Sequence, residues 1–327
     1  MKVLFTDRVW GDASVETRII EAAGHTLIDA NLGRPTPEEV RKLVTAERPD
    51  ALLVCFARIS AKVLDVVDLK IIARTGIGLD NAPVEAARVR SIPVTKVPDY
   101  CVEEVSDHAV ALALTLLRHI PDLNALTQGG TRQPSAATFT RFHHLTTGIV
   151  GCGRIGSATA RKFAGLGLRI VGHDPFVESH DDIEMMDLDA LAAAADVISL
   201  HTPLFEGTHH LVSDDFLSRT KPTAIVVNTA RGPLIDTDAL VRTLDQGRIG
   251  GTALDTLEGE PAVPTALTSR NNVILTPTSP FPRCNRSKSC GGARPKKWSA
   301  PSPASPSCTR CKARVPPVVL GASGYCA

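Results

Sequence analysis

The stretch Gly151-Cys152-Gly153-Arg154-Ile155-Gly156 decides the fold, because of the segments on either side of it. Residues 147–150 form a short apolar run that predicts a β-strand, and residues 157–164 predict a helix. A second apolar run, 168–173, ends at Asp174. Strand, glycine turn, helix, strand and carboxylate in this order form the context that a dinucleotide-binding fingerprint requires.

Each part of the fingerprint has a separate physical task. Gly151 makes the tight turn, Gly153 lets the backbone approach a pyrophosphate, and Gly156 lets helix and strand pack closely. The pyrophosphate is expected at the helix N-terminus, beside Arg154 and Ile155, where unpaired N–H groups and the helix dipole favour an anion.

Asp174 lies 18 residues beyond Gly156, where its carboxylate can accept hydrogen bonds from an adenosine ribose. A negative charge at this position would repel a 2′-phosphate. The sequence therefore favours NAD over NADP as the cofactor.

The composition is that of a globular protein with about two domains: 327 residues, of which 43% are hydrophobic and 22% charged. No apolar stretch approaches the ~20 residues of a membrane span, and the apolar run at the N-terminus is too short for a secretory signal. We therefore expect a cytoplasmic protein without a membrane partner.

Short apolar runs alternate with helical patterns along most of the chain, which predicts an α/β fold with parallel sheets covered on both faces. In the first part, strands are expected at 3–5, 25–28, 51–55, 70–74 and 92–95, and helices at 15–23, 36–47 and 83–90. A long apolar helix at 103–118 is suited to linking two domains. We expect a substrate domain at 1–97 and a dinucleotide-binding domain at 98–278, followed by an aberrant tail at 279–327.

Three further segments combine a strand with polar residues. The loop 74–81 can expose backbone N–H groups to a substrate carboxylate, although it can equally be a tight strand-to-helix turn. Arg231 follows the apolar strand within 226–232 and can grip a carboxylate, or it can be a solvated surface residue. Asp255 and Glu260 lie in an acidic segment that can be either a solvated loop or part of a nicotinamide and acid–base site.

Together with Pro98–Val105 and Leu200–Leu204, these motifs occur in an order that resembles the D-isomer-specific 2-hydroxyacid dehydrogenases. That group includes phosphoglycerate dehydrogenases, glyoxylate reductases and the C-terminal-binding-protein corepressors. The resemblance covers residues 1 to about 277 and implies two doubly wound, Rossmann-like domains, with the cofactor domain inserted into the substrate domain. It also implies a homodimer that binds NAD and a small 2-hydroxy or 2-oxo acid. We expect no specific nucleic acid partner and no metal.

The resemblance assigns roles to individual residues. Ile77 and Gly78 would bind the substrate carboxylate through their amides, Arg231 would hold the carboxylate and the carbonyl, and Glu260 would pair with a catalytic histidine. The cofactor would contact a larger set: Gly151, Gly153, Arg154, Ile155, Gly156, Asp174, His201, Thr202, Pro203, Thr208, Thr229, Ala230 and Asp255.

The catalytic histidine itself is missing. In the family it follows a Thr-Pro pair at the end of a late strand, and here Thr276-Pro277 is followed by Thr278. A threonine hydroxyl stays protonated at neutral pH, and losing a general acid–base group costs about 10²–10⁴-fold in rate.

The tail beyond this point differs in composition from the rest of the chain. Every Asp and Glu lies at or before Glu260, whereas residues 279–327 carry nine Lys or Arg residues, eight prolines and five of the eight cysteines. If the gene is read one base earlier, the codons for Pro277-Thr278 can encode a histidine. In the same frame the codons for residues 283–298 can encode a charged amphipathic helix. We hypothesise that one base was lost near codon 277. A zinc site on the tail cysteines and a basic nucleic-acid arm are weaker interpretations.

Two functions follow from the sequence. The first is an NAD-dependent dehydrogenase that transfers hydride between nicotinamide and a small 2-hydroxy or 2-oxo acid, impaired as written because Thr278 replaces the histidine. The alternative is a catalytically silent NAD-binding protein like the corepressors.

Overall fold

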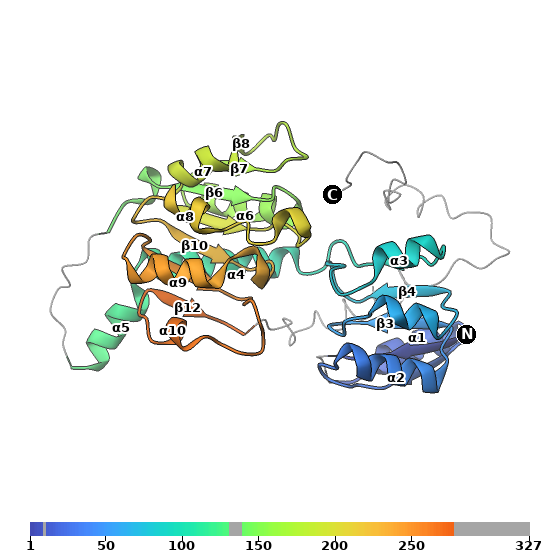
Figure 1. Cartoon of the computed structure of the whole chain (residues 1–327). Coiled ribbons are helices and arrows are strands. Elements are labelled where there is room, and N and C mark those ends of the chain that lie inside the picture. The colour runs from blue at the N-terminus through green and yellow to red at the C-terminus, as the bar shows by residue number, and fades with distance from the viewer. Residues whose placement is uncertain (9–10, 131–138, 278–327) are drawn as a thin grey trace. The chain divides into compact units, whose positions relative to one another are not determined.

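A computed structural model describes residues 1–8, 11–130 and 139–277 of the chain. The chain divides into two compact units, Met1–Tyr100 and a second that begins at Cys101 (Figure 1). This division falls three residues beyond the boundary expected at 97/98. Thr278 and the tail 279–327 lie outside the described residues, as do residues 9–10 and 131–138.

The first unit is a five-stranded parallel sheet in the order β2-β1-β3-β4-β5. Its strands are β1 (Lys2–Phe5), β2 (Thr26–Asp29), β3 (Ala51–Val54), β4 (Ile71–Arg74) and β5 (Val94–Thr95). Its helical segments are α1 (Ser14–Ala22), α2 (Pro37–Glu47), η1 (Ala61–Asp65) and α3 (Val84–Val89). Successive residues of β1 alternate between two cores, since Leu4 packs in one cluster while Val3 and Phe5 pack in the other.

The second unit is a seven-stranded parallel sheet in the order β12-β11-β10-β9-β6-β7-β8. Its strands are β6 (Thr146–Val150), β7 (Arg169–His173), β8 (Glu184–Met185), β9 (Val197–Leu200), β10 (Ile225–Asn228), β11 (Gly251–Leu254) and β12 (Val273–Leu275). Its α-helices are α4 (Val102–Leu117), α5 (Ile120–Gln128), α6 (Arg154–Gly165), α7 (Leu188–Ala194), α8 (Asp214–Ser218), α9 (Thr237–Asp245) and α10 (Thr265–Thr268). Three short 3₁₀ segments are η2 (Phe142–His144), η3 (Glu206–Thr208) and η4 (Gly232–Leu234).

Both faces of this sheet are covered. Ile149 packs in one core with residues of α4 and α6, whereas its neighbour Val150 packs in the other with residues of α7, α8 and α9. The chain runs outward from β6 through β7 to β8 and then returns to β9 on the other side of β6. In open parallel sheets such a switch of direction leaves a ligand crevice outside the carboxyl ends of the strands.

Among the described residues, no single helix is long and apolar enough to cross a membrane. Within these described ranges, only α4 and α5 together reach the required length and composition, and the two helices are bent by 58° at the break between them.

Candidate cofactor-binding and catalytic site

The glycine turn after β6 has the geometry expected of a dinucleotide-binding loop. Gly151 has a φ of +92°, and a Cβ there would lie 2.7 Å from the backbone nitrogen of Thr202. A Cβ on Gly156 would lie 2.0 Å from the carbonyl oxygen of Gly151. A Cβ on Gly153 would meet nothing within 4 Å. Two of the glycines therefore allow close packing within the protein, and the third leaves open space for a ligand.

Helix α6 begins directly at this turn without a side-chain cap, because its N-cap residue is Gly153. By contrast, α2 and α9 are capped by the side chains of Thr36 and Asp236. The first N–H groups of a helix have no partner within the helix. The N-terminus of α6, which begins at Arg154 and Ile155, is therefore suited to an anion such as a pyrophosphate.

Asp174 follows the last residue of β7, and two backbone amides hold its carboxylate. Its Oδ2 accepts from the N–H of Cys152 at 2.9 Å, and its Oδ1 accepts from the N–H of Phe176 at 3.0 Å. Each carboxylate oxygen can accept a second hydrogen bond, so the group keeps acceptors for ribose hydroxyls. The hydrogen bond from the Cys152 N–H thus links the glycine turn directly to Asp174.

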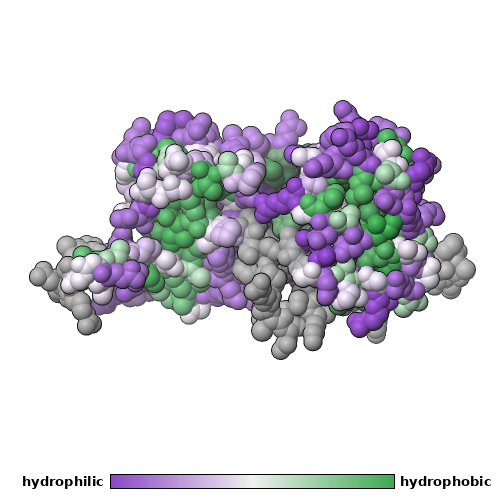
Figure 2. Space-filling view, turned by 90° about the horizontal axis from the view of Figure 1, so that it is seen from below, coloured by the Kyte–Doolittle hydropathy of each residue, from purple (hydrophilic) through white to green (hydrophobic). Residues whose placement is uncertain are grey.

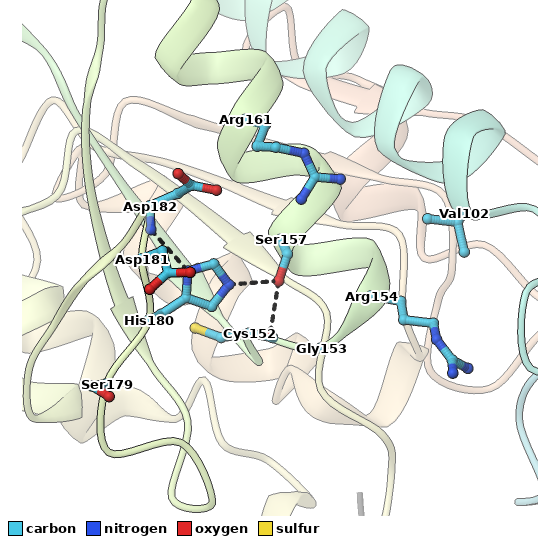
Figure 3. Close-up of a pocket in the computed structure, with 10 residues that line it drawn as sticks. All are labelled: Val102, Cys152, Gly153, Arg154, Ser157, Arg161, Ser179, His180, Asp181 and Asp182. Carbon is cyan, nitrogen blue, oxygen red and sulfur yellow. Dashed lines mark hydrogen bonds between the residues drawn. The ribbon is translucent and has the colours of Figure 1, made fainter. Parts of the chain in front are cut away.

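A pocket of about 700 Å³ lies at the start of α6, and Gly153 and Arg154 form part of its lining (Figure 3). On its wall, Ser157 Oγ lies 3.0 Å from His180 Nε2 and donates to the carbonyl oxygen of Cys152. His180 Nδ1 accepts from the N–H of Asp182 at 3.1 Å, which places the imidazole proton on Nε2, toward Ser157. The sequence did not indicate His180, because no motif marks the loop after Asp174, and Ser157 was predicted only as part of the helix.

Cys152 is not a nucleophile in this pocket. Burial, with a smaller contribution from the neighbouring carboxylate of Asp174, raises the pKa of its thiol to about 12. A thiolate, which is the reactive form, is therefore not populated at neutral pH.

The loop after β9 closes another side of the glycine turn. The backbone of Thr202 lies so close to Gly151 that a side chain at Gly151 would clash with it. The hydroxyl of Thr208 donates to the carbonyl oxygen of Pro203 at 2.7 Å. Burial lowers the pKa of His201 to about 3, so this ring is neutral beside the Ser199 hydroxyl at 2.9 Å. Thr208 and His201 thus shape the loop, and neither is placed to carry a proton at neutral pH.

The turn after β10 carries Thr229, Ala230 and Arg231. Asn228 clamps it, since its side chain accepts from the Ala230 N–H at 3.0 Å and donates to the Arg231 carbonyl at 2.8 Å. Within the described part of the chain, the buried Thr229 Oγ1 has no hydrogen-bond partner. Such orphaned groups are rare in native proteins, so a ligand hydrogen bond fits this position.

Arg231 and Glu260 belong to adjoining segments. A Cβ on Gly232 would lie 2.1 Å from the carbonyl carbon of Leu257 and 2.4 Å from the nitrogen of Glu258, so these backbones are in direct contact. Glu260 Oε1 accepts from the N–H of Leu257 at 2.8 Å, which fixes the carboxylate within its own loop.

Asp255, at the end of β11, belongs to a three-residue cluster that the sequence did not predict. Its Oδ1 accepts from the Thr276 hydroxyl at 2.6 Å and lies 3.2 Å from His108 Nε2. His108 Nε2 is also 3.0 Å from Thr276 Oγ1. A histidine on the apolar helix α4 therefore reaches the carboxyl ends of β11 and β12.

Ile77 and Gly78 lie in the first unit, in the half-buried loop after β4. Asn81, at the end of that loop, donates to the carbonyl oxygens of Cys55 and Ala57 at 3.1 and 3.0 Å. Asp7 accepts from three successive N–H groups of the same segment, 55–57. The loops at the carboxyl ends of β1, β3 and β4 are thus tied together.

Residues 110–278 match the family described as D-isomer specific 2-hydroxyacid dehydrogenase, NAD binding domain. The chain belongs to this family. The fold expected from the resemblance, two Rossmann-like parallel sheets, is confirmed. The prediction of NAD as the cofactor is likewise confirmed by the family.

Two relatives and one solved structure illustrate the similarity. The D-3-phosphoglycerate dehydrogenase of Mycobacterium bovis is 37% identical over 247 residues, which are 74% of this chain and 47% of that protein. The glyoxylate reductase of Thermofilum pendens is 35% identical over 257 residues, covering 74% of this chain and 75% of that protein. The chain therefore spans about half the length of the phosphoglycerate dehydrogenases it matches. The crystal structure of D-lactate dehydrogenase from Aquifex aeolicus, complexed with NAD and lactic acid, aligns with a TM-score of 0.81 and 25% identity, covering 90% of this chain and 94% of that one.

Proposed function

We propose that this chain is built as an NAD-dependent oxidoreductase that interconverts a small 2-hydroxy acid and its 2-oxo acid. The observation that carries the proposal is the uncapped start of α6 beside the open position of Gly153, with Asp174 bonded to the same turn. Arg231 supplies a cation for an acidic substrate, and the adjoining loop carries Glu260, a carboxylate that can orient a histidine.

Several residues would hold the cofactor. The N-terminal amides of α6 bind the pyrophosphate, and Asp174 accepts from the adenosine ribose. Thr229 Oγ1 supplies a buried polar group near the end of β10. NAD, when bound, accepts or supplies a hydride. Asp174 favours this cofactor over NADP, because a 2′-phosphate would meet its negative charge.

Arg231 would bind the substrate carboxylate with its planar guanidinium and polarise the oxygen at the reacting carbon. That the Ile77 and Gly78 amides bind the substrate carboxylate stays a prediction from the sequence. Glu260 would orient a histidine and raise its basicity, as a carboxylate does in other acid–base sites. In the written sequence Thr278 stands where that histidine is expected, so proton transfer at the hydroxyl lacks its acid–base group.

A second function rests on that same substitution. With Thr278 in place, the chain would bind NAD and leave substrate unreacted, as expected of a corepressor-like NAD-binding protein. Fluorescence quenching with NADH measures binding, and NADH oxidation with glyoxylate, hydroxypyruvate or phosphohydroxypyruvate measures turnover. Quenching without detectable oxidation supports the silent protein, whereas measurable oxidation that is about 10²–10⁴-fold slower than in ordinary dehydrogenases supports the impaired enzyme.

The frameshift is tested at the nucleotide level. Sequencing of the gene across Leu275–Arg283 should find a site where one added base restores a histidine codon. A chain with Thr278→His and the other-frame tail should then gain turnover by about 10²–10⁴-fold. A clean reading frame without that relationship, or no gain in turnover, contradicts the hypothesis.

We further propose a homodimer. Helix α5 has no buried residue although it is half apolar, and Ile120 and Leu126 are 51% and 40% exposed. Figure 2 shows apolar side chains gathered in patches on the viewed face of each unit. Light scattering during gel filtration should give twice the chain mass, and Ile120→Glu should shift it to the monomer. A cytoplasmic location and the lack of a nucleic acid partner remain predictions.

A further inference from the structure

Two loops of the second unit bring three potential metal ligands together outside the cofactor pocket. His209 and His210 follow η3, and Glu258 lies in the loop after β11. One ligand atom from each of these residues lies within 4.8 Å of the others. In the part of the chain that the structure describes, this is the one such group of three.

We propose that His209, His210 and Glu258 form a binding site for a divalent transition metal ion such as Zn²⁺. Imidazole nitrogens with one carboxylate are a donor set that binds zinc in proteins, and they also suit nickel and copper. The sequence indicated no metal site, and Glu258 lies 48 residues beyond His210, so no short ligand motif marks this group.

The distances from the Glu258 carboxylate to the two imidazole nitrogens are compatible with a shared ion. Glu258 Oε1 lies 2.9 Å from His210 Nε2 and 3.9 Å from His209 Nε2. Metal–ligand distances of about 2.0–2.2 Å in tetrahedral geometry put neighbouring donors roughly 3.4 Å apart. The two observed separations fall on either side of that value, so shifts of about half an ångström would complete the site.

The backbone aims both rings at the carboxylate. Successive side chains of an extended segment normally point to opposite sides. His209 is extended, but His210 has a φ of +52°, a conformation that non-glycine residues adopt seldom. As a result the two rings face each other with centroids 3.9 Å apart and an interplanar angle of 31°. If this group served only the hydrogen bond between His210 and Glu258, the ring of His209 would not need to lie beside them.

The same short segment anchors both ligand loops. The N–H of His210 donates to the carbonyl oxygen of Pro233 at 2.8 Å, and the Glu258 backbone lies directly against Gly232. Both contacts are on η4, so the ligands are held in place before an ion arrives. Such preorganisation lowers the cost of binding.

The chemical surroundings also suit a cation that exchanges with solvent. The side chains of His209, His210 and Glu258 are 52%, 35% and 32% exposed, which leaves room for water as the remaining ligand. The loop of Glu258 carries two further carboxylates, Asp255 and Glu260. An ion bound here would tie the His209–His210 loop to the loop that holds Glu260.

The test measures Zn²⁺ binding to the full-length chain by competition with a chromophoric chelator, after alkylation of the thiols so that the cysteines cannot contribute. Wild type should bind one equivalent that Glu258→Gln and His209→Ala each weaken by at least tenfold. His143→Ala is the matched control, because His143 and His144 form a second adjacent pair with ring centroids 4.0 Å apart. This variant should bind like wild type.

Stability supplies a second readout, because an ion that binds the folded state raises its melting temperature. Zn²⁺ should raise the melting temperature of wild type and His143→Ala, and much less that of Glu258→Gln. Equal zinc affinity in all four proteins would overturn the proposal, as would a loss in His143→Ala equal to that in His209→Ala. Neither result depends on NAD binding or turnover, so the site is tested separately from the proposed function.

Discussion

Two glycines of the fingerprint, Gly156 and Gly153, should respond to alanine in different ways, since a Cβ at each would face different atoms. In Gly156→Ala the new Cβ would lie 2.0 Å from the Gly151 carbonyl oxygen, a backbone atom, and 3.1 Å from the Ile149 side chain. Helix α6 must therefore move away from β6. Overpacking of this kind costs about 1–3 kcal/mol of unfolding free energy. The displaced helix should also bind NAD more weakly, by about tenfold for each 1.4 kcal/mol of lost binding free energy.

Gly153→Ala should separate ligand binding from stability. Its Cβ meets no protein atom within 4 Å, so it occupies the space expected for the pyrophosphate. Alanine stabilises the folded protein by reducing the entropy of the unfolded chain, and it destabilises the helix because it is a poorer N-cap than glycine. Since these effects oppose each other, the free energy of unfolding should change by less than about 1 kcal/mol. NAD affinity should nevertheless fall by at least tenfold, since a methyl group blocks the ligand.

Urea unfolding and calorimetric titration with NAD on the same preparations provide the assay. Gly165→Ala is the matched control, because it lies in the same helix with open space around its Cβ and should leave NAD affinity unchanged. Unchanged NAD affinity in Gly153→Ala would refute the placement of the pyrophosphate. Wild-type stability in Gly156→Ala would refute the close contact between helix and turn.

Three other variants or probes test single parts of the site. Asp174→Ala should lower the preference for NAD over NADP by at least about tenfold, since the charge that repels a 2′-phosphate is gone, and titrations with both cofactors measure the ratio. Arg231→Gln should weaken binding of the 2-oxo acid by about 1.5–3 kcal/mol of binding free energy while NADH binding stays unchanged. The loss is measured as a higher KM for the 2-oxo acid or, if the protein is silent, as weaker binding of oxamate. Cys152 should resist iodoacetamide at pH 8 in the folded protein, because burial raises the pKa of its thiol to about 12. Mass spectrometry reads the modification, and labelling of Cys152 as fast as of the half-buried Cys101 would contradict it.

The sequence was sufficient for features that depend on neighbours along the chain. The strand, glycine turn, helix and acid from 147 to 174 appear in the structure as β6, α6, β7 and Asp174, because each element is marked by its own local pattern. The helix expected at 36–47 is likewise present, as α2 with Thr36 as its N-cap.

Features that depend on tertiary proximity could not be read in this way. His108 and Thr276 are 168 residues apart, and the packing of α4 beside β10 and β11 brings them together. The same holds for His180 at the pocket wall and for Glu258 beside His210. In each case the sequence shows an isolated polar residue without a motif, which gives no indication of its partner.

The central claim is that the turn between β6 and α6 binds NAD, and isothermal titration of the purified full-length chain tests it most directly. We predict a saturable 1:1 isotherm with NAD⁺ and with NADH, and much weaker binding of NADP⁺. A correctly folded protein that takes up neither form of the cofactor at millimolar concentration would contradict the account.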